Sequence, residues 1–169
     1  MCKLSPSLVL ATLLPVTLSA AETNFVDVVA LGEIRNGESS DGWTVSSVTN
    51  YAERYYRALR FTTDSYVISP TFNHPVTQLK MVTISSSDAA RRLTVTPLRE
   101  GVAATNLSRA CTYSSTAYRL TEQKLTWPRG ANVRSFRLQL EGGGSTGWGI
   151  RTMSVISDDP ASGLVLSVR

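Results

Sequence analysis

The chain has 169 residues and a formal net charge of +4, and 42% of its residues are hydrophobic. This length suffices to bury one core without cross-links. Its basic residues are scattered, with Arg91-Arg92 as a rare adjacent pair, whereas nucleic-acid binders gather such residues on one face. The composition therefore argues against a nucleic-acid partner, and its one His and two Cys argue against a Cys/His metal site.

Residues 1–21 have the layout of a secretory signal peptide. Lys3 precedes an apolar run over Leu8–Leu18 that is too short to cross a bilayer as a helix, and small residues follow at Ser19-Ala20-Ala21. We expect cleavage before Glu22 or one residue earlier, and hence a secreted, cell-surface or periplasmic protein. A buried N-terminal helix is the alternative. The rest of the sequence contains no candidate membrane span.

Residues 22–169 carry short apolar runs separated by turn segments rich in Gly, Pro, Ser and Asn, which predicts one all-β domain. Tyr51–Arg57 is the exception, because it also fits one turn of helix. Residues 158–163 resemble a linker before a final strand. The predicted strands are Val26–Leu31, Thr44–Val48, Ala58–Phe61, Tyr66–Ser69, Leu79–Ser85, Arg91–Leu98, Arg119–Leu125, Arg134–Glu141, Arg151–Ser157 and Leu164–Val168.

The clearest strand is Arg134–Glu141, in which Phe136, Leu138 and Leu140 alternate with polar residues. In the run from Leu79 to Ile84 the apolar positions change phase, which predicts a bulge or burial on both faces. About nine or ten strands with turns every eight to twelve residues are typical of an antiparallel β-sandwich. We therefore predict a sandwich of the jelly-roll type.

The segment "EIRNGESSDGW" is the best candidate for a cation site. Glu38 and Asp41 lie in this turn-like stretch, and calcium accepts oxygen ligands from irregular loops. A solvated turn is the simpler interpretation, since the spacing matches no known calcium loop. We expect no cofactor other than this structural calcium.

Cys111 is the only cysteine that remains once a leader containing Cys2 is removed. It then has no partner for a disulfide within the chain. A lone thiol outside the cytosol can be buried and inert, paired with another chain, or reactive. We expect the buried, inert form.

The stretch "EGGGSTGWGIR" matches two catalytic patterns, GxGxxG over Gly142–Gly147 and GxSxG around Ser145. Both patterns require a helix directly after the loop, whereas the following residues predict a strand. The single His74 also lies upstream of Ser145, where the nucleophile-elbow fold does not place its base. We therefore expect the loop of a hairpin between two paired strands, with Ser145 not catalytic.

Three segments, "DSYVISPTFNHPVTQLKM", "RRLTVTPL" and "FRLQLEGGGSTGWGIRTMSV", carry a resemblance at the level of fold. Together they resemble the galactose-binding-like jelly-roll modules of exported bacterial proteins. The resemblance implies a mostly non-catalytic role in carbohydrate binding or adhesion, in some members with a structural calcium.

We therefore expect a secreted, non-catalytic module that binds a glycan or an extracellular protein. The candidate ligand-binding residues are Trp148, Arg151 and Trp43. A structural spacer within a larger exported protein is the first alternative, and a hydrolase that uses His74 or a carboxylate pair in a cleft is the second. Tryptophan exposure discriminates among these hypotheses, because a spacer buries all its tryptophans, whereas Trp148 in a binding module can stand free as a stacking platform.

Overall fold

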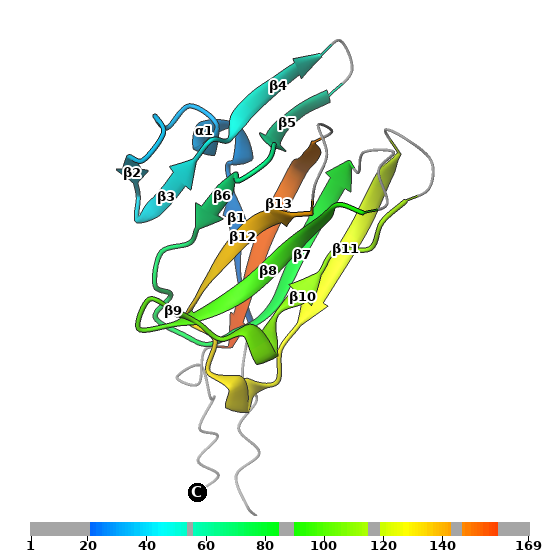
Figure 1. Cartoon of the computed structure of the whole chain (residues 1–169). Helices are drawn as coiled ribbons and strands as arrows, with labels where there is room; N and C mark the ends of the chain where they lie inside the picture. Colours follow the sequence, from blue (N-terminus) through cyan, green and yellow to red (C-terminus); the bar gives the residue numbers. More distant parts are fainter. Residues whose placement is uncertain (1–20, 54–55, 85–89, 115–118, 143–146, 159–169) are drawn as a thin grey trace, which may run out of the picture.

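The chain folds into two antiparallel β-sheets that pack face to face (Figure 1). The structure is a computed structural model and describes residues 21–53, 56–84, 90–114, 119–142 and 147–158. The expected signal peptide up to residue 20 and the predicted strand Leu164–Val168 lie outside these residues. Among the described residues, no helix is long and apolar enough to cross a membrane.

The first sheet is built around its longest strand, β13 (Trp148–Asp158). Its strands are β1 (Ala21–Val26), β4 (Thr49–Glu53), β5 (Tyr56–Phe61), β7 (Val76–Ile84), β11 (Leu120–Thr126) and β13 (Trp148–Asp158). One edge of β13 pairs with β7, and the other edge pairs first with β5 and then with β1. β11 pairs with β7, and β4 pairs with β5.

The second sheet is centred on β12. Its strands are β2 (Ser39–Ser40), β3 (Trp43–Ser46), β6 (Tyr66–Ile68), β8 (Arg92–Arg99), β9 (Val102–Ala103), β10 (Arg109–Ala110) and β12 (Ser135–Glu141). β12 lies between β8 and β6, and β3 and β2 extend the sheet beyond β6. The helical elements are the short helix α1 (Val28–Leu31) and the 3₁₀ turns η1 (Thr105–Leu107) and η2 (Arg129–Ala131).

The strand order is that of a jelly roll. Four strands of the first sheet lie in the order β11-β7-β13-β5, and four of the second lie in the order β10-β8-β12-β6. Among these eight strands the chain crosses to the other sheet at each step except from β8 to β10, as the two Greek keys of a jelly roll require. The predicted antiparallel jelly-roll sandwich is therefore confirmed, with additional short strands at its edges.

The glycine-rich stretch is a crossing between sheets, so the predicted hairpin is wrong. β12 pairs with β6 and β8, whereas β13 pairs with β1, β5 and β7. The chain enters this stretch from a strand and leaves it at Trp148 into another strand, as predicted, so the helix that both catalytic patterns need is not there. Residues 143–146, which include Ser145, lie outside the described residues.

The predicted strand Val26–Leu31 is also wrong, because a helical turn replaces most of it. β1 ends at Val26, and the Asp27 side chain caps α1 by accepting hydrogen bonds from the backbone N–H groups of Val29 and Ala30 at 3.0 and 3.1 Å. Such capping by Asp satisfies backbone donors that a strand would have paired with a neighbour. The turn also buries Val28 and Leu31.

The described part of Tyr51–Arg57, residues 51–53 and 56–57, lies in strands, so the alternative helical turn is not observed there. The antiparallel strands β4 and β5 occupy this region, with Asn50 opposite Leu59 and Thr49 opposite Arg60. Leu59 and Phe61 are fully buried and Arg60 is not, so the alternation expected of a strand governs this segment.

The phase change in β7 comes from burial on both faces. Leu79 and Met81 face the core, while Ile84 is 8% exposed although it lies on the opposite face of the strand. Ile84 is paired with Gly149 of β13, and an added Cβ on Gly149 would be in ordinary van der Waals contact with Ile84 Cβ at 3.7 Å. The pairing of β7 with β13 has two register shifts: one between Ile150 and Thr152 of β13, opposite the Leu79–Ile84 run, and one between Ile156 and Ser157, outside that run.

The core is formed by the inner faces of both sheets. On β12 the predicted alternation is confirmed, since Phe136, Leu138 and Leu140 are buried. Trp43, Trp127 and Trp148 are buried as well, with exposed fractions of 8%, 3% and 1%. Trp148 therefore folds over the end of the core, and the alternative of a free-standing platform is not observed.

Substitution Trp148→Ala is expected to lower the free energy of unfolding by about 3–5 kcal/mol, because it removes a large aromatic side chain from a packed core. Chemical denaturation measures this change. Phe25→Ala is the matched control, since Phe25 is 86% exposed and its loss leaves no cavity. Equal effects of the two substitutions would contradict the buried position of Trp148.

Cys111 is buried, as expected, with 2% of its surface exposed. Burial raises the pKa of its thiol from 9.0 to about 12, because the apolar surroundings disfavour the thiolate. The folded protein thus keeps the thiol neutral at pH values where the unfolded chain ionises it. A thiolate is the reactive form of cysteine, so this environment suppresses reactivity.

This raised pKa predicts a pH dependence of stability. The contribution of Cys111 is fully present below pH 9 and is lost as the pH rises toward 12, since only the unfolded state then releases the proton. Between pH 9 and 10 the wild type is expected to lose about 1 kcal/mol more than Cys111→Ala. Urea unfolding at the two pH values measures this difference, and parallel losses in both proteins would refute it.

Candidate functional site

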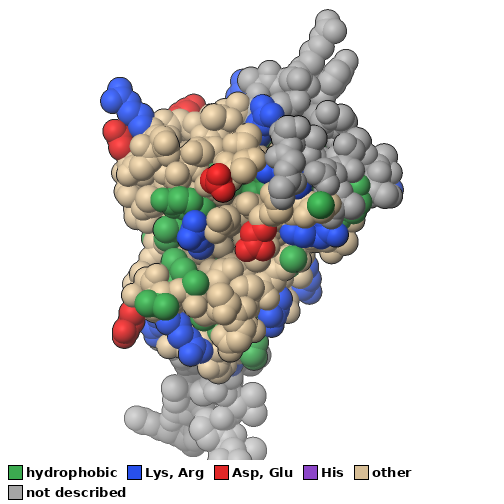
Figure 2. All heavy atoms as spheres, in the orientation of Figure 1, with side chains coloured by type: hydrophobic (Ala, Val, Ile, Leu, Met, Phe, Trp, Pro, Cys, Tyr) green, Lys and Arg blue, Asp and Glu red, His purple; other side chains and the backbone are tan. Residues whose placement is uncertain are grey.

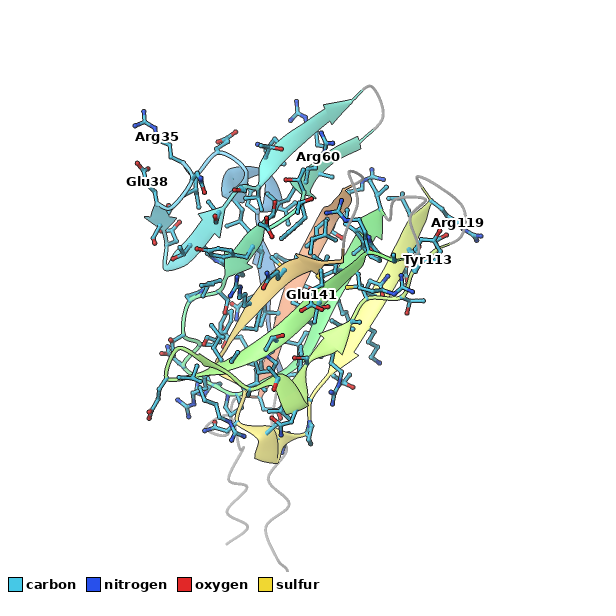
Figure 3. All side chains as sticks on the ribbon, in the orientation of Figure 1. Arg35, Glu38, Arg60, Tyr113, Arg119 and Glu141 are labelled. Atoms are coloured by element: carbon cyan, nitrogen blue, oxygen red, sulfur yellow. The ribbon has the colours of Figure 1, made fainter. Side chains whose placement is uncertain are left out.

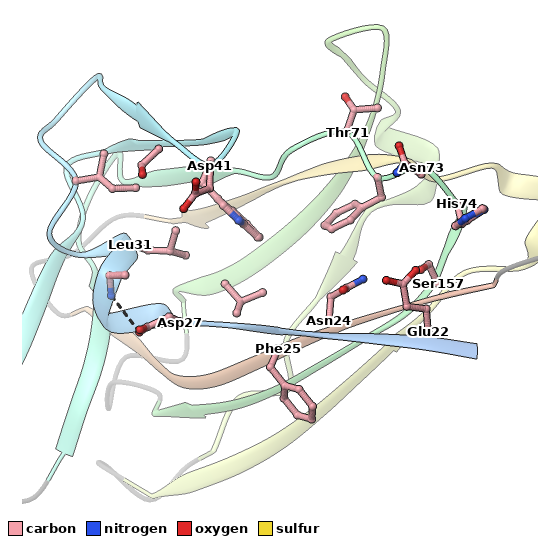
Figure 4. A pocket seen from close by; sticks show the side chains of 16 residues that line it. Glu22, Asn24, Phe25, Asp27, Leu31, Asp41, Thr71, Asn73, His74 and Ser157 are labelled. Carbon is pink, nitrogen blue, oxygen red and sulfur yellow. Dashed lines mark hydrogen bonds between the residues drawn. The ribbon is translucent and has the colours of Figure 1, made fainter. Parts of the chain in front are cut away.

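A hollow of about 470 Å³ opens along one edge of the sandwich. Its walls are β1, α1 with its N-cap Asp27, the β2–β3 hairpin and the connection from β6 to β7, residues 71–74 (Figure 4). These segments are far apart in the sequence, and Ser157 near the end of β13 completes the lining. We refer to this hollow as the edge pocket. Its volume lies within the range of about 300–1,000 Å³ that is usual for ligand sites.

The wall formed by β1 and α1 is held in place by a contact with β4. The Asn50 side-chain amide donates a hydrogen bond to the Val29 carbonyl oxygen at 3.0 Å. Gly32 leaves the space for this contact, because an added Cβ would stand 2.1 Å from Asn50 Oδ1. The direction in which the chain leaves β1 is therefore determined by the Asp27 cap on one side and by Asn50 on the other.

The opposite wall is joined to the loop before β12 by backbone hydrogen bonds. Phe72 N donates to Arg134 O, and Val76 N donates to Val133 O, both at 2.7 Å. Proline at position 75 has no N–H to satisfy. The polar side chains of Thr71, Asn73 and His74 are thus carried by a backbone that is fixed at both ends.

Aromatic side chains form the apolar base of the edge pocket. Phe72 stacks on Phe136 with ring centroids 6.0 Å apart, and Trp43 meets the same ring edge-on at 6.1 Å. Phe136 is fully buried, so the core fixes the position of both rings. Such offset and edge-to-face pairs are preferred over a face-to-face sandwich. Trp43 and Phe72 therefore present rigid apolar surface to the pocket.

The charged groups of the edge pocket are mostly acidic. Its described lining holds Glu22, Asp27 and Asp41 together with His74, and it holds no Lys or Arg. Figure 4 shows Asp27 and Asp41 at one end of the pocket and Glu22, His74 and Ser157 at the other. The pocket thus favours neutral or cationic ligands, although the chain as a whole has a net charge of +4.

The predicted ligand-binding residues do not form one site. Trp43 lines the edge pocket, but Trp148 is packed in the core. Arg151 is exposed at the register irregularity of β13, whereas Ile150 beside it points into the core. Of these three candidates, the structure therefore assigns a place in a pocket to Trp43.

Of the two predicted calcium ligands, only Asp41 lines the edge pocket. Glu38 lies at the outer end of the β2–β3 hairpin near Arg35 (Figure 3). Within the described ranges, no group of three or more His, Cys, Asp or Glu side chains is placed to hold a metal ion. Two exposed carboxylates fall short of the six to eight oxygen ligands that calcium prefers. Calcium binding here stays a prediction.

Sequence patterns gave no indication of Asn24, Thr71 or Asn73 as site residues. Asn24 lies on β1, and the other two lie in the segment "SPTFNHP", which reads only as a turn. Their proximity arises when β1 pairs with the second half of β13. No local signal in the sequence encodes that pairing.

On the face shown in Figure 2, Lys and Arg side chains are scattered among other residues and do not form one continuous patch.

No family model and no curated protein matches the chain. The resemblance to galactose-binding-like modules therefore stays a prediction about this sequence.

Proposed function

We propose that the protein is a non-catalytic binding module that takes a carbohydrate in the edge pocket. The observation that carries this proposal is the combination of rigid aromatic surface with convergent polar side chains in one hollow of about 470 Å³. A sugar ring has apolar C–H faces and a rim of hydroxyl groups, so it needs both kinds of surface. Ligand pockets in general combine apolar lining with a few placed polar groups.

The polar side chains of the pocket suit hydroxyl groups. Asn24 and Asn73 each offer a donor and an acceptor, Thr71 offers a hydroxyl group, and Asp41 offers acceptors. Figure 4 shows Asn24 pointing from β1 into the hollow, across from Thr71 and Asn73. Hydroxyls of one ligand can therefore be bound from two walls. The acidic lining disfavours a sugar acid.

Export from the cytosol is part of this proposal. The expected cleavage site before Glu22 coincides with the start of β1, so that cleavage leaves Thr23–Val26 and their partners in β13 intact. Mass spectrometry of the exported protein is expected to find Glu22 or Ala21 as the first residue. Retention of Lys3 in that material would refute the signal peptide.

The burial of all three tryptophans favours a second candidate, the structural spacer. In the described part of the chain, Trp43, Trp127 and Trp148 are each less than a tenth exposed. A spacer needs no exposed aromatic platform. It would, however, leave the edge pocket without a role, and glycan binding therefore discriminates between the two candidates.

A hydrolase is the third candidate, favoured by the presence of His74 in the same pocket as carboxylates. Glu22 and Ser157 lie at the same end as His74 (Figure 4). Proton transfer would need these groups within hydrogen-bond reach of a bound substrate. Loss of hydrolysis on His74→Ala would favour this candidate over the binding module.

Glycan-array screening of the mature protein, followed by calorimetry on the best ligand, tests the proposal. Asn73→Ala and Asp41→Asn are expected to weaken binding about tenfold or more, since each removes a hydrogen-bond partner or a charge from the site. Asn at position 41 tolerates the positive φ of 50° found there.

Asn106→Ala is the matched control, because Asn106 is exposed in η1 and does not line the pocket. It is expected to bind as the wild type does, and all three variants are expected to unfold at the same temperature as the wild type. Absence of binding to any neutral or cationic glycan would favour the spacer, and equal weakening by the control would show that the edge pocket is not the site.

A further inference from the structure

One arginine is enclosed in the protein without partners for most of its donors. Arg91, immediately before β8, has an exposed fraction of 0%. Its Nη2 donates a hydrogen bond to Thr63 Oγ1 at 2.9 Å. Its Nε and Nη1 are buried, and no residue in the described part of the chain accepts a hydrogen bond from either of them. Trp148 Nε1 is a further buried donor with no acceptor among these residues.

Arg91 and Trp148 lie at the same end of the sandwich. Trp148 begins β13 and is paired with Phe61, the last residue of β5. Thr63, which accepts the hydrogen bond from Arg91, follows Phe61 by two residues. Arg91, through Thr63, and Trp148, through its pairing with Phe61, are therefore both joined to the chain segment that leads from β5 into the turn before β6. We refer to this region as the donor end.

Two glycines close the backbone over the donor end. An added Cβ on Gly142 would stand 2.4 Å from the Ala90 carbonyl oxygen and 3.2 Å from Arg91 Cα, and Gly142 has a φ of +97°. An added Cβ on Gly147 would stand 2.4 Å from the Phe61 carbonyl oxygen. The described glycines of the "EGGGSTGWG" stretch thus allow close packing against the segments that carry Arg91 and Trp148.

An enclosed guanidinium requires a counter-charge. Arginine does not lose its proton in proteins, so burial cannot be relieved by neutralisation. A buried charge is strongly unfavourable unless it is paired and hydrogen-bonded. Glu141, opposite Arg92 in β12, does not supply the pairing, because it is exposed and accepts a hydrogen bond from Thr94 on the outer face (Figure 3). Within the described residues, Arg91 forms no ion pair.

We propose that the donor end binds an oxyanion, namely a carboxylate, phosphate or sulfate group, through Arg91 Nε and Nη1, with Trp148 Nε1 as an additional donor. Charge-assisted hydrogen bonds from arginine to such groups are stronger than neutral ones. The ligand class is opposite in charge to the one that the edge pocket favours. This inference is independent of the carbohydrate proposal.

Calorimetry and thermal unfolding with inorganic phosphate, sulfate and acetate test the proposal, with chloride at matched ionic strength as the reference. One of these oxyanions is expected to bind saturably and to raise the melting temperature of the wild type by several degrees, since a ligand that binds only the folded state stabilises it. The relative affinities distinguish a carboxylate from a phosphate or sulfate ligand.

Arg91→Met is expected to abolish this binding, and Arg57→Met, which removes an exposed arginine from β5, is expected to retain it. Arg91→Lys keeps the charge without the planar donors and is expected to bind about tenfold more weakly. Trp148→Phe removes the indole N–H but keeps an aromatic ring, and it is expected to weaken binding several-fold while the protein stays folded. These two variants keep the test decisive if Arg91→Met does not fold.

Equal stabilisation of the wild type and Arg91→Lys by each anion would reduce the effect to a general influence of salt and overturn the proposal. A carboxylate of the chain itself that pairs with Arg91 would overturn the proposal as well. Asp88 lies outside the described residues but only three positions before Arg91. If Asp88→Asn destabilises the protein as strongly as Arg91→Met, and no oxyanion binds the wild type, then Asp88 neutralises the charge of Arg91 and the proposal is wrong.

Discussion

Strand β13 is the element on which the rest of the structure depends, because it pairs with three other strands. β7 follows one of its edges, while β5 pairs with its beginning and β1 with its second half on the other edge. In the described part of the chain, β13 is the single strand that pairs with β1. The wall of the edge pocket that carries Asn24 therefore exists because of this pairing. At the opposite end of the same strand, Trp148 enters the core beside the donor end. One strand thus positions both candidate sites.

The core supports the edge pocket directly. Phe136 belongs to β12 and is fully buried, yet it touches both Trp43 and Phe72, which line the pocket. Rings that are fixed by core packing lose little conformational freedom when a ligand binds, so less of the binding free energy is spent on ordering them. The loop that carries Asn73 is likewise fixed by backbone hydrogen bonds from Phe72 and Val76. The pocket is therefore preorganised by the same packing that stabilises the fold.

The sequence predicted the elements whose signal is local and missed those that depend on long-range pairing. Alternation of apolar residues identified β12 correctly, and the density of turns identified the sandwich. At Val26–Leu31 the hydrophobic residues fit a strand, but the side chain of Asp27 caps a helical turn instead. The glycine-rich stretch reads as a hairpin because strands flank it, and local sequence does not say that those strands belong to different sheets. Of the candidate ligand-binding residues only Trp43 lines the edge pocket, while Trp148 is buried and Arg151 lies elsewhere; of the candidate calcium ligands only Asp41 lines it. Asn24 and Asn73, which a distant strand pairing brings together, were not predicted.

The arrangement of charge in the folded chain differs from what its composition suggests. A net charge of +4 spread over scattered arginines indicates no particular partner. Folding nevertheless places Glu22, Asp27 and Asp41 around one hollow and encloses Arg91 at another place in the sandwich. Electrostatic interactions are stronger away from bulk water, so an enclosed arginine influences ligand choice more than exposed ones do. Burial also changes what Trp148 can offer a ligand. Its ring is not exposed for stacking, but its indole N–H has no acceptor in the described part of the core. On the two proposals above, the edge pocket selects its ligand through acidic and polar side chains at the surface, and the donor end selects its ligand through the enclosed Arg91.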